Sequence, residues 1–300
     1  MARIWDIDCD GILGPEELLD RVQGKVDGRD PESLAECAAD LRALANDRSF
    51  VLDAFHKELE GFWSGNRDNA HQPQSIQLAN TRDFFLRANI WLPIEKGERT
   101  EQFQKRLYSY ELAHDHNFSF LTVGYFGLGY ETDIFEYEWG RCVGYQGETA
   151  GCRFLGRYRL NPGRVMMYRG GRDIHVQYTP ADVSVSVNLM GRNSDVNWDQ
   201  QYIFDPETDR LVGGAGDLVS NRLYLIECAQ HVGNGETAGI LADLVRTFPC
   251  DKSKAMALRS LDRLLPEEAE RARAGASAKV RTLAQLPLIS GNYARSYSGA

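Results

Sequence analysis

The sequence has no apolar run long enough to cross a lipid bilayer. A transmembrane helix needs about 20 consecutive apolar residues, and no stretch of the chain approaches that length. The first residues, Met1 to Asp8, also turn acidic where a signal peptide would be apolar. We therefore expect a cytoplasmic protein without a membrane partner.

Paired cysteines and runs of basic residues are also missing. The six cysteines are scattered without paired spacing, so we expect reduced thiols rather than a disulfide framework. The 34 basic and 43 acidic side chains give a net charge of −9. No run of Lys and Arg could neutralise a phosphate backbone, so nucleic acid is not an expected partner.

The two ends of the chain have helical periodicity. Residues 1–72 predict an N-terminal helical extension, because Pro31 precedes an acidic residue and leucines then recur at helical spacing. A polar, turn-rich stretch closes this region. Residues 228–300 predict a C-terminal helical cap and a mobile, Ser/Gly-rich tail.

The middle region, residues 73–227, predicts a β-barrel. Short runs rich in aromatic and β-branched residues alternate with Gly-rich turns, as in all-β barrels and sandwiches. The fold class is thus α+β, a central β-barrel flanked by N-terminal and C-terminal helices. The expected strands lie at residues 83–92, 118–125, 130–137, 164–168, 174–178, 183–189 and 222–226.

The flanking helices should belong to the same folded unit as the barrel. Each helical region is too short to bury a stable core alone, whereas the outer sheet faces need covering. We expect Trp63, Trp91 and Leu92, near the junction, to take part in that packing.

Three of the six histidines lie in the predicted β region. Because residues i and i+2 of a strand share a face, His114 and His116 can present two imidazoles to one barrel interior, while Asp115 faces the other way. His175, on a later strand, can complete three nitrogen donors for Fe(II), Mn, Ni, Cu or Zn. The alternative is two histidines that only form hydrogen bonds in a polar barrel mouth.

This pattern resembles the cupin superfamily, in which a His-x-His strand is followed by a Pro-x-Gly-like turn and a histidine on a later strand. The matching residues are His114, His116, the Pro162-Gly163 turn and His175, within residues 107–190. The resemblance implies a cupin-type double-stranded β-helix. It also implies that the three histidines are the metal ligands.

The sequence departs from the family pattern at one position. Many cupins carry a Glu four or five residues after the second histidine, but Phe120 and Leu121 stand here. Either the site has three histidines, as in the thiol dioxygenase branch of the superfamily, or a carboxylate comes from the acids at residues 131–138. We favour three histidines.

Aromatic and basic residues near the histidines supply candidate catalytic groups. Tyr125 and Tyr168 are predicted to line a dry barrel mouth, although an aromatic there can equally be core packing. Six arginines fall within residues 153–172, and Arg164 is our candidate for binding a substrate carboxylate. The others should mostly pair across strands with the acids at 131–138.

These features predict a non-haem Fe(II) dioxygenase or hydroxylase that uses O2 on a small carboxylate-bearing or amino-acid-like metabolite. A non-catalytic ligand-binding cupin and a cupin isomerase or epimerase are the alternatives. Use of 2-oxoglutarate stays open, because the Arg-x-Ser of such oxygenases occurs here as Arg192-Asn-Ser194, seventeen residues after His175. A homodimer is also left open.

The N-terminus carries a second candidate metal site. Asp6, Asp8, Asp10 and Glu17 occupy the acidic positions of a twelve-residue EF-hand calcium loop, with Gly11 at its sixth position. They are therefore candidate Ca²⁺ ligands, although an entering helix and a second loop are missing. The alternative is a solvated acidic turn.

Overall fold

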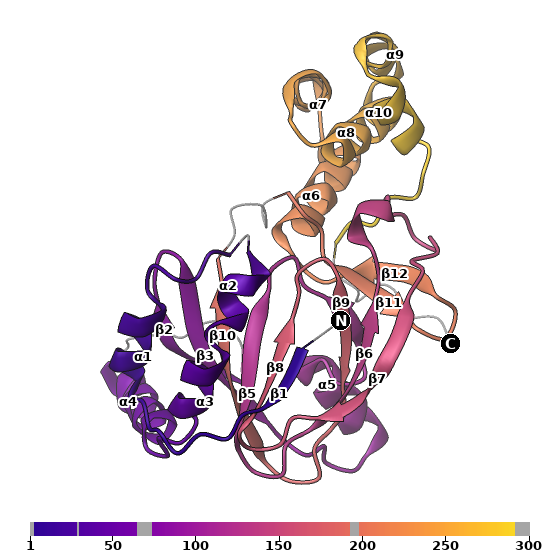
Figure 1. Cartoon of the computed structure of the whole chain (residues 1–300). Coiled ribbons are helices and arrows are strands. Elements are labelled where there is room, and N and C mark those ends of the chain that lie inside the picture. Colours follow the sequence, from indigo (N-terminus) through magenta and orange to yellow (C-terminus); the bar gives the residue numbers. More distant parts are fainter. Residues whose placement is uncertain (1–2, 29, 65–73, 193–197, 292–300) are drawn as a thin grey trace. The chain divides into compact units, whose positions relative to one another are not determined.

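The computed structural model describes residues 3–28, 30–64, 74–192 and 198–291 (Figure 1). The chain divides into two compact units, each with an apolar core. The six cysteines all lie within the described residues, and none of them is in a disulfide. The first unit comprises Met1–Tyr137 and Cys152–Ser194, and the second comprises Glu138–Gly151 and Asp195–Ala300.

The first unit is built on two antiparallel sheets. In one sheet the strand order is β3-β10-β5-β8, and in the other it is β4-β9-β6-β7. This order is that of a jelly roll, in which Greek keys close two sheets into a barrel. The expected α+β fold with a double-stranded β-helix is therefore confirmed. The strands are β3 Phe84–Trp91, β4 Ala113–Asp115, β5 Phe120–Phe126, β6 Glu131–Glu136, β7 Arg153–Arg159, β8 Arg164–Tyr168, β9 Asp173–Gln177 and β10 Ser184–Gly191.

Four elements of this unit were not expected. Strand β1 (Arg3–Asp6) pairs with β8, within the region predicted to be helical. Helix α5 (Glu98–Tyr108) lies between β3 and β4, within the region predicted to be all-β. Strand β7 carries three arginines and one glycine, so its sequence has a weak strand signal. Strand β2 (Ser75–Asn80) extends the first sheet beside β3.

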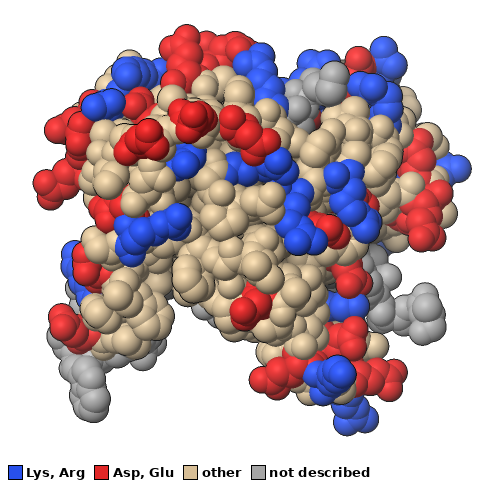
Figure 2. All heavy atoms as spheres, turned by 60° about the horizontal axis from the view of Figure 1, so that its bottom comes forward, with Lys and Arg blue, Asp and Glu red and all other residues tan. Residues whose placement is uncertain are grey.

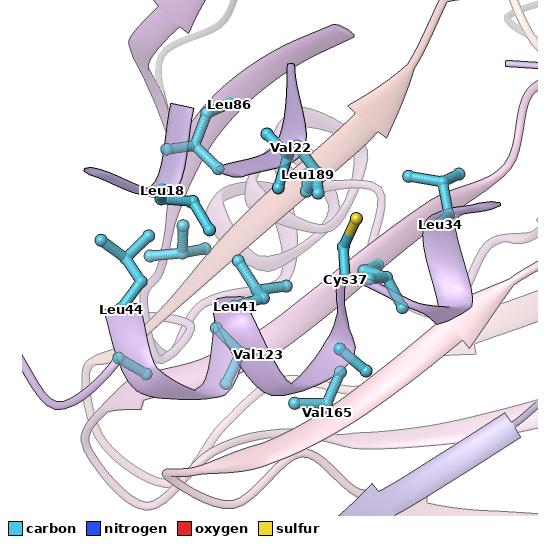
Figure 3. Packing of buried hydrophobic residues seen from close by; sticks show 14 of the residues in the cluster. Leu18, Val22, Leu34, Cys37, Leu41, Leu44, Leu86, Val123, Val165 and Leu189 are labelled. Atoms are coloured by element: carbon cyan, nitrogen blue, oxygen red, sulfur yellow. The ribbon is translucent and has the colours of Figure 1, made fainter. Parts of the chain in front are cut away.

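Helices α1 to α4 cover the outer face of the β5–β8 sheet (Figure 1). Many of their apolar side chains point toward those of the strands, and several are fully buried (Figure 3). On the helices these include Leu18, Leu41 and Leu44, and on the strands Leu86 and Leu189. The helix bounds are α1 Pro15–Val22, α2 Pro31–Ala35, α3 Ala38–Leu44 and α4 Phe50–Ser64.

The inner faces of the barrel hold a separate aromatic core. The Trp91 ring lies 4.5 Å from the Tyr130 ring and 6.0 Å from the Tyr110 ring. The prediction that Trp91 packs against the helices is therefore wrong, because its position in β3 turns it to the opposite face of the sheet. Leu92 is 36% exposed, and the side chain of Trp63 lies outside the described residues.

The turn before β8 has the conformation that its sequence favours. Gly163 has a φ of 83°, and Arg164 N donates to the Asn161 carbonyl oxygen at 3.0 Å. Pro followed by a residue of positive φ fits a type II turn. Gly124 of β5 allows the turn to approach, because a Cβ there would lie 2.1 Å from Asn161 O.

The second unit combines a hairpin with a helical core. In the hairpin, β11 pairs with β12. The buried side chains of the core come mainly from α6, α7 and α8. The predicted helices of the C-terminal region are present. The elements are β11 Tyr202–Asp205, β12 Arg210–Gly214, α6 Leu218–Val232, α7 Gly235–Thr247, α8 Asp251–Leu264, α9 Pro266–Gly275 and α10 Ala278–Leu283.

The strand predicted at residues 222–226 is wrong, because these residues lie in α6. Val219, Leu223 and Ile226 are buried at helical spacing. The Asp217 carboxylate caps the helix by accepting hydrogen bonds from two backbone N–H groups of its first turn. The predicted boundary after residue 227 consequently falls inside this helix.

The surface mixes charges of both signs. On the face shown in Figure 2, basic and acidic side chains lie among one another rather than in separate regions. Ion pairs join many of them, as between Arg3 and Glu32 at 2.6 Å. Within the described residues, no helix combines the length and the apolar character that a membrane span requires.

Candidate metal centre

Three imidazoles meet inside the barrel of the first unit. His114 of β4 pairs in register with His175 of β9, and His116 directly follows β4. One ligand nitrogen of each lies within 4.8 Å of the others. In the part of the chain that the structure describes, no other group of three His, Cys, Asp or Glu side chains is placed closely enough to share an ion. The structure thus assembles the predicted metal ligands.

The separation of two imidazole nitrogens fits a shared ion. The Leu112 carbonyl oxygen lies 2.9 Å from His114 Nδ1, so Nδ1 donates and Nε2 keeps its lone pair. His114 Nε2 lies 3.0 Å from His175 Nε2. Two nitrogens bound about 2.1 Å from one ion, at about 90° to each other, are about 3.0 Å apart. The Gln177 Nε2 atom lies 3.2 Å from His175 Nδ1 and 3.5 Å from His175 Nε2.

Burial keeps the imidazoles in the form that binds metal. It lowers the pKa of His114, against a smaller, raising effect of the Leu112 carbonyl. The pKa of His175 lies well below its usual value, mainly through burial and further through the charges of His114, His116 and Arg87. His114 and His175 are therefore neutral at neutral pH, as metal ligands must be.

Aromatic rings surround the histidines. The His116 ring lies 4.9 Å from the Phe118 ring and 5.3 Å from the Phe120 ring. Phe120 stacks on Tyr168, whose ring lies 4.7 Å from that of His175. Phe120 and Tyr168 are buried, whereas His114 and His116 keep some exposure. The cluster is thus shielded by apolar groups and still open to solvent.

Among the predicted catalytic side chains, only Tyr168 contacts the histidines. Tyr125 packs on the outer face of its sheet, with its ring 5.2 Å from that of Phe50 and the Arg48 guanidinium 5.5 Å from its centre. Arg164 donates from Nε and Nη2 to the Asp6 carboxylate, at 2.8 and 2.7 Å. Tyr125 and Arg164 thus have their partners away from the histidine cluster.

The other arginines of residues 153–172 pair with acids, as expected. Strand β7 places Arg153, Arg157 and Arg159 in register with Glu136, Asp133 and Glu131 of β6. Each of these arginines forms an ion pair with the acid opposite. The acids of β6 are therefore engaged by arginines, and none of them joins the histidine cluster. The three-histidine reading of the site is consistent with this arrangement.

The predicted calcium ligands are not assembled. Asp6 lies in β1, and Arg164 binds its carboxylate. Among the described residues, the acids of this loop do not form a group close enough to share an ion. The Asn46 amide holds the loop instead, since it donates to the backbone carbonyls of Cys9 and Gly11, each at 2.8 Å.

Sequence reasoning missed Arg87, which lies in β3. Positions 85, 87, 89 and 91 share one face of this strand, and Trp91 shows that this face is the barrel interior. Arg87 Nε is buried and has no hydrogen-bond acceptor in the described part of the chain. The alternation of residues in β3 places Arg87 on the same face as Trp91, which is the signal for an inward-facing arginine.

The jelly-roll order and the three inward histidines define a cupin-type double-stranded β-helix with a candidate metal centre. No family model and no curated protein matches the chain. Among solved structures, it is similar to hydroquinone 1,2-dioxygenase PnpCD in complex with Cd²⁺ and 4-hydroxybenzonitrile. That match has 7% identity and a TM-score of 0.27, and covers 42% of this chain and 69% of the other.

Two further solved structures are similar to parts of the chain. A cupin domain from Bordetella pertussis Tohama I has 12% identity and a TM-score of 0.23, over 42% of this chain and 100% of the domain. A cupin-superfamily sugar phosphate isomerase from Silicibacter pomeroyi DSS-3 has 10% identity and a TM-score of 0.24, over 44% and 71% of the two chains. The strand order of the two sheets defines the fold.

Proposed function

We propose that the chain is a metal-dependent oxygenase that uses Fe(II) and O2 on a small, carboxylate-bearing or amino-acid-like metabolite. The observation that carries this proposal is the convergence of His114, His116 and His175, with ligand nitrogens within 4.8 Å of one another. Three neutral nitrogen donors leave further metal positions open for substrate and oxygen. An Fe(II) ion held there would supply electrons for the activation of O2.

The side chains around the histidines have distinct roles in this proposal. Phe118 and Phe120 exclude water from one side of the cluster. Burial raises the pKa of the Tyr168 hydroxyl, so at neutral pH this group is a hydrogen-bond donor and not a base. Neutral imidazoles do not compensate the charge of a divalent ion, which favours an anionic substrate.

Metal analysis of purified protein tests the site. Wild type should contain about one divalent ion per chain, and His114→Ala and His175→Ala should each lose it while they stay folded. His56→Ala, an exposed histidine on α4, is the matched control and should retain the ion. Unchanged metal content in both cluster variants would refute the site.

Oxygen uptake tests the reaction. Fe(II)-loaded protein should consume O2 with at least one member of a panel of amino acids and small carboxylates, assayed with and without 2-oxoglutarate. Turnover without oxygen would instead indicate an isomerase or epimerase. If a ligand binds with the same affinity after chelation of the metal and no turnover occurs, the barrel is a ligand-binding module.

A further inference from the structure

Arg87 is a cation of the barrel interior for which the described residues supply no anionic partner. Its Nε is buried with no acceptor, and no carboxylate of the described residues forms an ion pair with it. Burial lowers the pKa of its guanidinium to about 10, so it stays charged at neutral pH. A buried charge without a partner is costly, and an unsatisfied buried group calls for an explanation. An anion bound at Arg87 would pair with this charge.

Arg87 stands in a polar row that crosses the first sheet. It is in register with Asn188 of β10, which is in register with Thr122 of β5. Asn188 Oδ1 accepts a hydrogen bond from Thr122 Oγ1 at 2.6 Å. This bond orients the Asn188 amide, whose Nδ2 group is a hydrogen-bond donor on the same face of the sheet as Arg87.

This row is next to the one that contacts the histidines. Phe120, two residues before Thr122 on β5, packs on His116. Two residues of a strand span about 6.6 Å. Phe120 is in register with Met190, and Met190 is in register with Phe85 of β3, so Arg87 lies two residues along β3 from this row. A molecule of a few carbons is long enough to reach from Arg87 to the histidines.

We propose that Arg87 and Asn188 bind the carboxylate of the substrate inside the barrel while its reacting end lies at the histidines. This inference rests on the proposed function, because it takes the histidines as the reacting centre. The guanidinium Nε and one terminal nitrogen form a planar fork that matches two carboxylate oxygens. Arg87, His114 and His116 keep some exposure, so an anion can enter from solvent.

Propionate and its neutral analogue propionamide test the subsite by calorimetric titration of the full-length protein as purified. Wild type should bind propionate at least tenfold more tightly than propionamide. Arg87→Met should abolish this preference, and Arg87→Lys should lose most of it because an ammonium lacks the planar fork. Arg164→Met, whose wild-type guanidinium pairs with Asp6, is the matched control and should retain the preference.

Thermal stability separates a binding role from a structural one. Without added anion, Arg87→Met should be at least as stable as wild type, because it removes an unpaired buried charge. A large drop in its Tm would show that Arg87 supports the fold, and would overturn the proposal. An unchanged preference for propionate in Arg87→Met would also overturn the proposal. Tighter binding of inorganic phosphate than of propionate at Arg87 in the wild type would overturn it as well.

The two proposals fail in different ways. Metal content measured on the same samples should be equal in wild type and Arg87→Met, since Arg87 is not a predicted ligand. His175→Ala should lose the metal and still prefer propionate over propionamide through Arg87. Absence of metal from wild type would count against the proposed function alone, whereas absence of the Arg87-dependent preference counts against the carboxylate subsite alone.

Discussion

Tyr168 stacks on Phe120, and its ring lies 4.7 Å from that of His175, while its hydroxyl donates to Met166 Sδ at 3.8 Å. Since burial keeps this hydroxyl protonated, we expect it to donate a hydrogen bond or a proton during turnover. Tyr168→Phe should keep the metal and the Tm and lower kcat for oxygen uptake about 100-fold.

Tyr125→Phe is the matched control, because Tyr125 packs against Phe50 on the outer face of the same sheet. It should leave kcat unchanged. Equal turnover by Tyr168→Phe and wild type would assign Tyr168 a packing role only.

The histidines were predictable from sequence, and the anion-binding arginine was not. His114 and His116 stand two residues apart, and the two-residue period of a strand alone places them on one face. Which arginine is available to bind an anion depends on which arginines have an acid opposite them. The register between strands that are distant in sequence determines these pairs. Arg164 meets Asp6 of β1, whereas Arg87 meets Asn188 of β10.

At the scale of elements, the β6–β7 ladder should contribute to acid stability. Hydrogen bonds from Arg153, and also from Arg169, lower the pKa of Glu136 to about 2. Because the folded-state pKa is depressed, the stabilisation is complete above the ordinary value of about 4.3 and is lost as pH falls toward 2. The free energy of unfolding of wild type should therefore fall more steeply over this range than that of Glu136→Gln, as measured by urea denaturation.

Glu131→Gln provides the comparison, because Glu131 forms a single, more exposed pair with Arg159. It should follow the wild-type pH profile closely. If Glu136→Gln follows it equally closely, the network around Glu136 adds nothing to acid stability.

Helix α3 should stabilise the first unit through its buried face. Leu41 is fully buried among strand side chains of the outer sheet face. Leu41→Ala should lower the free energy of unfolding by about 2–5 kcal/mol, through lost burial and a residual cavity. Leu52→Ala, at a position that is 53% exposed on α4, should change it by less than about 0.5 kcal/mol. Similar effects of the two substitutions in chemical denaturation would show that α3 does not pack as described.

The sequence pattern predicted those helices and strands in which buried residues recur at a regular spacing. It did not predict the others. Strand β5 is a mainly apolar run, β10 begins with alternating polar and apolar residues, and the positions of both were expected. The segment 222–226 has the residue types of a strand, but its capping Asp217 and the buried side chains of the same helix decide in favour of α6. Tertiary burial outweighs residue type there.

At the scale of the whole molecule, we propose that residues 1–72, 73–227 and 228–300 depend on one another for folding. Removal of residues 1–72 would uncover the apolar outer face that helices α1 to α4 cover. The shortened chain should be insoluble, or bind a hydrophobic dye strongly if it stays in solution. A soluble chain of residues 72–230 that unfolds cooperatively and retains metal would instead show that the flanking regions are separable.

The pairing of His114 with His175 joins positions 61 residues apart in the chain. An ion bound between them would cross-link the two ends of a long loop. An unfolded chain must lose conformational entropy to close this loop before it can bind the ion. Metal affinity therefore reports on folding: a chain in which β4 and β9 have not paired has no such site. Each tenfold rise in free metal above Kd should add about 1.4 kcal/mol to the stability of the folded chain, and chelation should speed its unfolding.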